Sequence, residues 1–258
     1  MLIDCHTHIG RNNNISSSVT ELLKSMDAAG IDKALVFASR LGNASNEYML
    51  EQIAPHTDRL YGVAMVSIDD RYPPSQYDRD KMDLIVDWYG EHKIVAVKFY
   101  TGYEHYYPGD VSYLLSRLDR IGCPAIFHSG DCLSSTKRAK LKYAHPLHID
   151  EVAVDYPGMN FIVAHLGFPW VLDTAEVCYK NSNVYTDISG FVYGEFNEDD
   201  KWNIDIAISE FCSIAPNEKL LFGTDWPISD QKSYVDTFGT AELEEMSKRT
   251  EAVFKLCS

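Results

Sequence analysis

The sequence predicts an α/β fold, a (β/α)8 TIM-like barrel, for a chain of 258 residues. Eight short apolar segments alternate with segments of helical periodicity, and the pair recurs at about thirty residues. No low-complexity linker interrupts the series, which predicts one domain over residues 1–258. A doubly wound open sheet would use the same alternation. The barrel is favoured because no glycine-rich phosphate loop follows the first apolar segment.

The first half of the chain predicts four strands, each followed by a helix. The first strand lies in MLIDCHTHIG, and the helix after it covers residues 19–30, where apolar residues recur at helical spacing and Gly30 forms a stop. The next elements are expected, in order, as a strand around residues 35–38, a helix at 46–56, a strand at 59–68, a helix at 81–92, a strand at 94–103 and a helix at 110–122.

The second half continues the pattern. Strands are expected at residues 123–131, 160–168, 183–191 and 219–228. Between the first two of them, HPLHIDEVAVDYPG predicts a short helix that Pro157 and Gly158 end. The remaining helices are expected at about residues 170–181, 200–215 and 240–256.

The composition restricts the class of partner. The formal net charge of −15 makes nucleic acid an unfavourable partner, since phosphate binding requires a basic face. Neither a signal peptide nor a membrane span is visible, so a cytoplasmic protein without a membrane partner is expected. The six scattered cysteines fit free thiols in a reducing compartment. These features favour a small-molecule substrate and leave a homodimer open.

Asp4, His6 and His8 alternate with other residues in the first strand. Side chains two apart on a strand share a face, so these three are expected on one side with the two imidazoles converging. Zn²⁺ takes neutral histidine nitrogens and needs ligands on a stiff support. A pair of surface histidines on an edge strand is the alternative.

Further polar residues lie in or just beyond other apolar strands, where an unpaired polar side chain is costly to bury. In a barrel, these carboxyl ends of the strands form the active-site face. The full set is His6, His8, Lys98, His128, His165 and Asp225. His105 lies in the loop after the fourth strand and is expected within reach of a substrate, whereas the other histidines suit helix ends or the surface.

The motifs IDCHTH, VAVKFY, IFHSGD, IVAHLGFPW and LLFGTDWPI together resemble the amidohydrolase superfamily of metal-dependent barrels. The resemblance is strongest to the amidohydrolase-related branch, which includes aminocarboxymuconate-semialdehyde decarboxylase, resorcylate decarboxylases and dicarboxylate lactonases. It covers nearly the whole chain. It implies that His6, His8, His128 and Asp225 bind one divalent ion and that His165 orients or deprotonates the attacking water, with Asp4 orienting the strand-one ligands.

Lys98 has two interpretations under this resemblance. A carboxylated lysine would bridge two metal ions, with His165 among the ligands of the second ion. With a single ion, which is favoured, Lys98 would contact a substrate carboxylate or act as a structural partner. Zn²⁺ is the expected ion, and Mn²⁺, Fe²⁺ or Co²⁺ also suit a mixed histidine and aspartate set.

The resemblance implies a metal-dependent hydrolase that cleaves a C–N, ester or lactone bond with metal-activated water. Asp225 would carry the proton to the leaving group, or, in the alternative interpretation, only cap its loop. A non-oxidative decarboxylase of an unsaturated or aromatic acid ranks second, and a non-catalytic metal-binding protein ranks third. The expected contacts to a small carboxylated or cyclic substrate are Arg11, Arg40, Tyr103, His105, Trp170 and Trp226.

Overall fold

The computed structural model describes residues 1–10, 17–38, 44–68, 79–133 and 136–256. Their strands form one eight-stranded sheet in chain order, and each neighbouring pair is parallel. The strands are β1 (Ile3–His8), β2 (Lys33–Phe37), β3 (Leu60–Val66), β4 (Ile94–Phe99), β5 (Ala125–Phe127), β6 (Phe161–Val163), β7 (Val184–Asp187) and β8 (Leu220–Leu221).

The chain that follows β8 returns to β1 and closes the barrel. The backbone N–H of Cys5 donates to Phe222 O at 2.8 Å, and the N–H of His8 donates to Trp226 O at 2.7 Å. Thr7 and Trp226 also form an isolated parallel bridge. The prediction of a (β/α)8 barrel is therefore confirmed.

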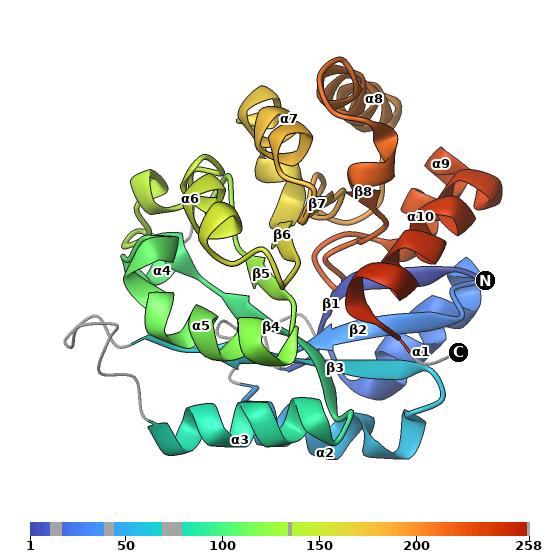
Figure 1. The fold of residues 1–258 in the computed structure, drawn as a ribbon. Helices are drawn as coiled ribbons and strands as arrows, with labels where there is room; N and C mark the ends of the chain where they lie inside the picture. Colours follow the sequence, from blue (N-terminus) through green and yellow to red (C-terminus); the bar gives the residue numbers. More distant parts are fainter. Residues whose placement is uncertain (11–16, 39–43, 69–78, 134–135, 257–258) are drawn as a thin grey trace.

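Helices surround the strands (Figure 1). The α-helices are α1 (Val19–Ala29), α2 (Asn46–Ile53), α3 (Arg79–Gly90), α4 (Thr101–Glu104), α5 (Ser112–Ile121), α6 (His148–Asp155), α7 (Val171–Lys180), α8 (Glu198–Cys212), α9 (Gln231–Phe238) and α10 (Thr240–Phe254). Short 3-10 segments are η1 (Ala54–His56), η3 (Pro108–Val111), η4 (Leu141–Tyr143), η5 (Ala164–Gly167) and η6 (Asn217–Lys219). Local sequence sets several ends: Ser18 and Glu21 form a capping box at α1, and Gly30 ends it in the left-handed conformation.

Two hydrophobic clusters divide the core. The larger cluster contains α1 residues such as Leu22 together with strand residues such as Val36, and so lies between the sheet and the helices. The smaller cluster contains alternate strand residues, including Leu35, Ile126 and Ile162, and so fills the interior of the barrel. The barrel is therefore packed from within below the polar residues at its carboxyl end.

Several strands end earlier than the sequence predicts. The strand expected at 94–103 ends at Phe99 and is followed by α4, and the strand expected at 160–168 ends at Val163 and is followed by η5. The strand expected at 219–228 pairs only at Leu220–Leu221, and α9 at Gln231–Phe238 was not expected. The physical reason at two of these ends is backbone shape, because His165 and Asp225 have positive φ values of 62° and 66° and cannot continue a strand.

Among the described residues, no helix is both long and apolar enough to cross a membrane. The described cysteines, namely Cys5, Cys123, Cys132, Cys178 and Cys212, are free thiols, as expected.

Gly130 is the glycine at which added bulk should disturb the active-site face most. We expect Gly130→Ala to lower the free energy of unfolding by at least about 3 kcal/mol, since a Cβ there would lie 2.3 Å from Phe168 O at a φ of 86°. Gly30→Ala is the matched control, because Gly30 has a φ of 73° and open space around it, so only the conformational cost of about 1–2 kcal/mol applies. Urea unfolding of both variants measures the difference, and equal losses would contradict the prediction.

Candidate active site

Strand β1 is irregular where its histidines begin. Its register against β2 shifts between Asp4 and Thr7, so the strict alternation of side chains is broken there. His6 is fully buried and stacks on Phe37 of β2, with 4.3 Å between the ring centroids. His6 and His8 both line a cavity at the carboxyl ends of the strands.

Asp4 does not share the cavity-facing side of His6 and His8, contrary to the expectation from the spacing of two. It is absent from the described residues that line the cavity. Its buried carboxylate accepts backbone N–H groups of His6 and Thr224 at 3.1 Å each, the Thr224 hydroxyl at 2.6 Å and the Gln231 amide at 2.8 Å. Burial raises the pKa of Asp4 to about 6 despite these bonds. Asp4 therefore joins β1 to the chain after β8, and its role in orienting ligands stays a prediction.

Asp225 reaches the β1 histidines from the loop after β8. Its Oδ1 lies 3.0 Å from His8 Nε2 and 3.7 Å from His6 Nε2. Burial raises the pKa of Asp225, but the hydrogen bond to His8 and the neighbouring imidazoles lower it more, so its pKa lies well below the usual range. The three side chains place two imidazole nitrogens and one carboxylate oxygen within 4.8 Å of one another.

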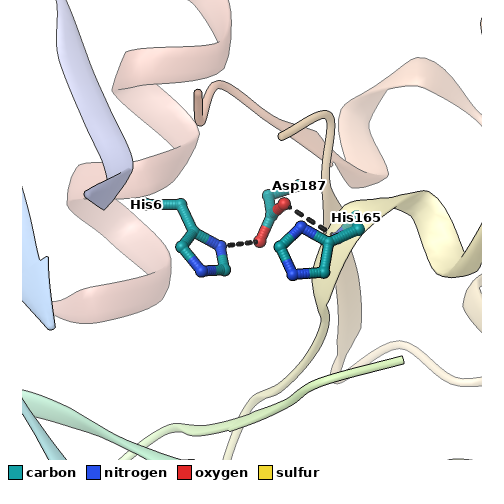
Figure 2. A group of neighbouring side chains, drawn as sticks. All are labelled: His6, His165 and Asp187. Atoms are coloured by element: carbon teal, nitrogen blue, oxygen red, sulfur yellow. Dashed lines mark hydrogen bonds and ion pairs between the residues drawn. The ribbon is translucent and has the colours of Figure 1, made fainter. Parts of the chain in front are cut away.

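Asp187, at the end of β7, forms a second close group with His6 and His165 (Figure 2). Its Oδ2 accepts from His6 Nδ1 at 3.0 Å, and its Oδ1 accepts the backbone N–H groups of His165 and Ser189 at 3.0 and 3.1 Å. Burial raises the pKa of Asp187, but the hydrogen bond and charge of His6 outweigh it and hold this pKa well below the usual range. Both carboxylate oxygens of Asp187 are thus occupied by hydrogen-bond donors.

The group formed by His6, His8 and Asp225 is the better match to a divalent metal ion. A histidine ligand must be neutral, and burial and then the charge of Lys98 lower the pKa of His6 to about 3. The carboxylate of Asp187 accepts a hydrogen bond from His6 Nδ1–H, which leaves the lone pair of Nε2 free for a metal, as in many metal sites. Two imidazoles and one carboxylate are also a ligand set found in catalytic zinc sites.

Lys98 projects from β4 toward the same point. Its buried Nζ lies 3.4 Å from His6 Nε2 and 5.3 Å from the centroid of the Phe37 ring. Burial lowers the pKa of Lys98 to about 8, opposed by the charges of Asp187 and Asp225. It is the sole lysine or arginine among the described residues that line the cavity. The predicted roles of Lys98, namely metal bridge, contact to a substrate carboxylate or structural partner, stay predictions.

His128 and His165 also line the site, with 5.0 Å between their ring centroids. His128 Nε2 lies 2.9 Å from the carbonyl oxygen of Asp131. His128 is outside both close groups of possible ligands in the described part of the chain, so its role as fourth ligand stays a prediction. His165 Nδ1 lies 2.9 Å from the hydroxyl of Ser189. Burial lowers the pKa of both imidazoles and favours their neutral forms.

The cavity above these groups has a volume of about 350 Å³, which suits a small molecule. Its walls are largely aromatic, and the rings are those of Tyr100, Tyr103, Phe168, Phe191 and Tyr193. Tyr103, a predicted substrate contact, is among these rings, and its hydroxyl accepts the backbone N–H of Leu133 at 3.1 Å. Arg11 and Arg40 lie outside the described residues.

Three other residues predicted to contact substrate are absent from the described cavity lining. His105 Nε2 lies 2.6 Å from Arg138 O, and the ring of Trp170 packs beside His145 with 4.7 Å between centroids. Trp226 is buried in the core outside the barrel interior. Each of the three side chains thus contacts neighbouring protein groups outside the described cavity lining, and the sequence pattern did not indicate these contacts.

Asp187 and Ser189 are the site residues that the sequence reasoning missed. They lie in TDISG, at the end of the seventh apolar strand. A polar residue at the end of a strand is the same signal that identified Asp225, so applying it to every strand would have found Asp187.

The geometry and the sequence comparisons agree. A family model described as amidohydrolase matches residues 3–255. The chain belongs to the amidohydrolase family. The predicted resemblance is therefore confirmed, and membership makes the chain an enzyme of a metal-dependent family whose possible metal site is the group of His6, His8 and Asp225.

Solved structures share the fold of this amidohydrolase at low sequence identity. A probable 2-pyrone-4,6-dicarboxylic acid hydrolase from Acinetobacter baumannii is 14% identical, with 99% of both chains covered and a TM-score of 0.69. A dihydroxybenzoic acid decarboxylase from Polaromonas sp. JS666 with bound manganese is 14% identical over 99% of this chain and 97% of that chain, with a TM-score of 0.68.

An amidohydrolase from Burkholderia multivorans with bound zinc is 13% identical over 99% of this chain and 92% of that chain, with a TM-score of 0.64. A search of curated proteins finds no significant match. The fold is thus shared by hydrolases and decarboxylases alike.

We expect the purified chain to contain about one divalent ion, and the double variant His6→Ala, His8→Ala to lose it, because two of the ligands are removed. Elemental analysis after dialysis measures the metal content. The matched control is His145→Ala with His148→Ala, two histidines absent from the described cavity lining. Retention of the ion by the His6 and His8 double variant would contradict the assignment.

Proposed function

We propose that this amidohydrolase is a metal-dependent hydrolase that cleaves a C–N, ester or lactone bond of a small carboxylated or cyclic substrate. The observation that carries the proposal is the convergence of His6 Nε2, His8 Nε2 and Asp225 Oδ1 at the cavity. Zinc is the proposed ion, with Mn²⁺, Fe²⁺ and Co²⁺ as alternatives that the same ligand types accept.

The proposed ligands are His6, His8 and Asp225, with His128 as a fourth. A divalent ion at this position supplies Lewis acidity, which lowers the pKa of water and polarises a substrate carbonyl. The burial of His6 favours the neutral imidazole that such binding requires. The low pKa of Asp225 keeps its carboxylate ionised in the absence of substrate.

Two groups are available to move protons. His165 lines the same cavity as Asp225, and burial lowers the pKa of its imidazole, so a neutral base is present at neutral pH. In the proposed reaction His165 orients or deprotonates the attacking water. When His165 only orients that water, Asp225 takes the proton from it and passes the same proton to the leaving group. Lys98 supplies a buried cation beside this group, since its Nζ lies 3.4 Å from His6 Nε2.

A decarboxylase of an aromatic or unsaturated acid is the second candidate. The specific observation in its favour is the combination of one buried lysine, Lys98, with walls of tyrosine and phenylalanine rings. Aromatic walls provide stacking surface for a planar ring, and the Lys98 ammonium provides a cation for its carboxylate. The Polaromonas decarboxylase shares this fold, as does the probable hydrolase from Acinetobacter baumannii, so fold similarity supports both candidate reactions equally.

Isotope labelling separates the two reactions. Lactones, N-acyl compounds and aromatic acids are first screened for turnover, and the active substrate is then incubated in H₂¹⁸O. We expect one ¹⁸O atom in the product carboxylate, because water is the nucleophile in hydrolysis. Incubation of the isolated product with enzyme in H₂¹⁸O controls for exchange. Release of CO₂ without incorporation of the label would replace the hydrolase proposal with the decarboxylase.

Substitution of Asp225 separates proton transfer from loop capping. We expect Asp225→Asn to lower kcat by at least about a hundredfold when metal content is restored by added ion, because the amide lacks a basic carboxylate. Asp173→Asn, at an exposed acid on α7, is the matched control. Near-normal turnover of the remetallated Asp225→Asn enzyme would mean that Asp225 only stabilises the loop.

A further inference from the structure

Ser189 lies between the two inner histidines of the site. It follows β7 and is fully buried. Its Oγ contacts the Oδ1 of Asp187 through a short hydrogen bond and lies 2.9 Å from His165 Nδ1 and 3.2 Å from His6 Nδ1. One hydroxyl therefore meets one carboxylate oxygen and two imidazole nitrogens.

The direction of each hydrogen bond follows from the number of protons available. A serine hydroxyl has one hydrogen to donate and two lone pairs, whereas an ionised carboxylate only accepts. The donors around Asp187 favour its ionised form. The single hydroxyl hydrogen of Ser189 must then point to Asp187 Oδ1. Without a hydrogen between them, the Ser189 and Asp187 oxygens would repel each other at hydrogen-bonding distance. The two lone pairs of Ser189 Oγ remain for the imidazoles.

Each imidazole must therefore supply its own hydrogen at Nδ1. For His6 the same conclusion follows independently, because its Nδ1 also lies 3.0 Å from Asp187 Oδ2, which accepts. For His165 the contact with Ser189 is decisive. A neutral imidazole carries one N–H, and the hydrogen bond at one nitrogen determines the state of the other.

The backbone beside Ser189 keeps the His165 ring in this position. A Cβ on Gly190 would lie 2.8 Å from His165 Nδ1, so the ring packs directly against the main chain. The backbone of His165 has a φ of 62°, and its backbone N–H donates a hydrogen bond to Asp187 Oδ1. The ring is thus held from its own backbone, from Gly190 and from Ser189.

We infer that Ser189, together with Asp187, is a positioning residue that holds neutral His165 as the Nδ1–H tautomer. The Nε2 of His165 then has a free lone pair and accepts a proton or a hydrogen bond in the cavity. This inference deepens the proposed function, since it rests on His165 as the base of that reaction. On this inference, Asp187 at the end of β7 and Ser189 in the following loop fix the tautomer of that base.

Nitrogen NMR of protein labelled with ¹⁵N-histidine tests the tautomer without any turnover. Zinc-loaded and metal-free protein are both measured at a pH where His165 is neutral, and His165→Gln identifies its signals. In the wild type we expect couplings and shifts of a protonated Nδ1 and an unprotonated Nε2. A wild-type His165 protonated at Nε2 would overturn the inference.

Variants at Ser189 test its part in the effect. In Ser189→Ala the acceptor is lost, and we expect a large fraction of His165 to shift to the Nε2–H form, which imidazole prefers in water. Ser189→Cys is the second variant, because the thiol keeps a side chain in the space but is only a weak acceptor; it should shift His165 in the same direction. Ser247→Ala removes another buried serine hydroxyl, on α10, and should leave the tautomer unchanged.

The outcomes are separable from those for the proposed function. An unchanged His165 tautomer in a folded Ser189 variant would overturn the role of Ser189, whatever reaction the enzyme catalyses. Failure of the ¹⁸O label to enter product would instead overturn hydrolysis and leave the tautomer result intact. Signals of the other histidines show whether each variant is folded.

Discussion

The site depends on how β1 joins the chain that follows β8. β8 pairs with β7 only at Leu220–Leu221, so most of the closure comes from residues beyond it. The backbone N–H of Asp225 donates to His6 O at 2.8 Å, and the carboxylate of Asp4 binds both β1 and Thr224. The hydrogen bonds that close the barrel are thus the same ones that bring Asp225 to the histidines.

The same closure requires unusual backbone shapes. Asp225 and His165 adopt left-handed conformations that non-glycine residues rarely take, at a cost on the order of 1–3 kcal/mol each. Gly223 lets β8 approach β1, because a Cβ there would lie 3.0 Å from the Cβ of His6. Packing of the barrel interior and the hydrogen bonds of Asp4 and Asp187 offset this cost. Rigid strands therefore end in short, strained turns that aim side chains into the cavity.

The barrel and the pairing of His6 with His8 could be predicted from sequence because both follow from simple periodicity, whereas the ligand role of Asp225 was implied only by the family resemblance. Apolar segments with polar ends identify strands, and a spacing of two brings His6 and His8 together. The register shift in β1 has no such signal, so Asp4 was placed on the wrong side. Asp187 was missed although it carries the same signal as Asp225, and α9 was missed because loop and helix signals overlap after the eighth strand.

The position of Lys98 connects the reaction to the orientation of the substrate. Its Nζ lies 3.4 Å from His6 Nε2, so a substrate carboxylate bound by Lys98 would lie directly beside the proposed metal ligands. Decarboxylation needs the carboxylate at the reacting centre, whereas hydrolysis needs the scissile carbonyl there and any carboxylate elsewhere. In a hydrolase, Lys98 therefore acts through the electrostatics of the site, and the substrate carboxylate must contact other groups. The two reactions thus differ in whether Lys98 binds the substrate carboxylate, while the surrounding histidines and aspartates stay the same.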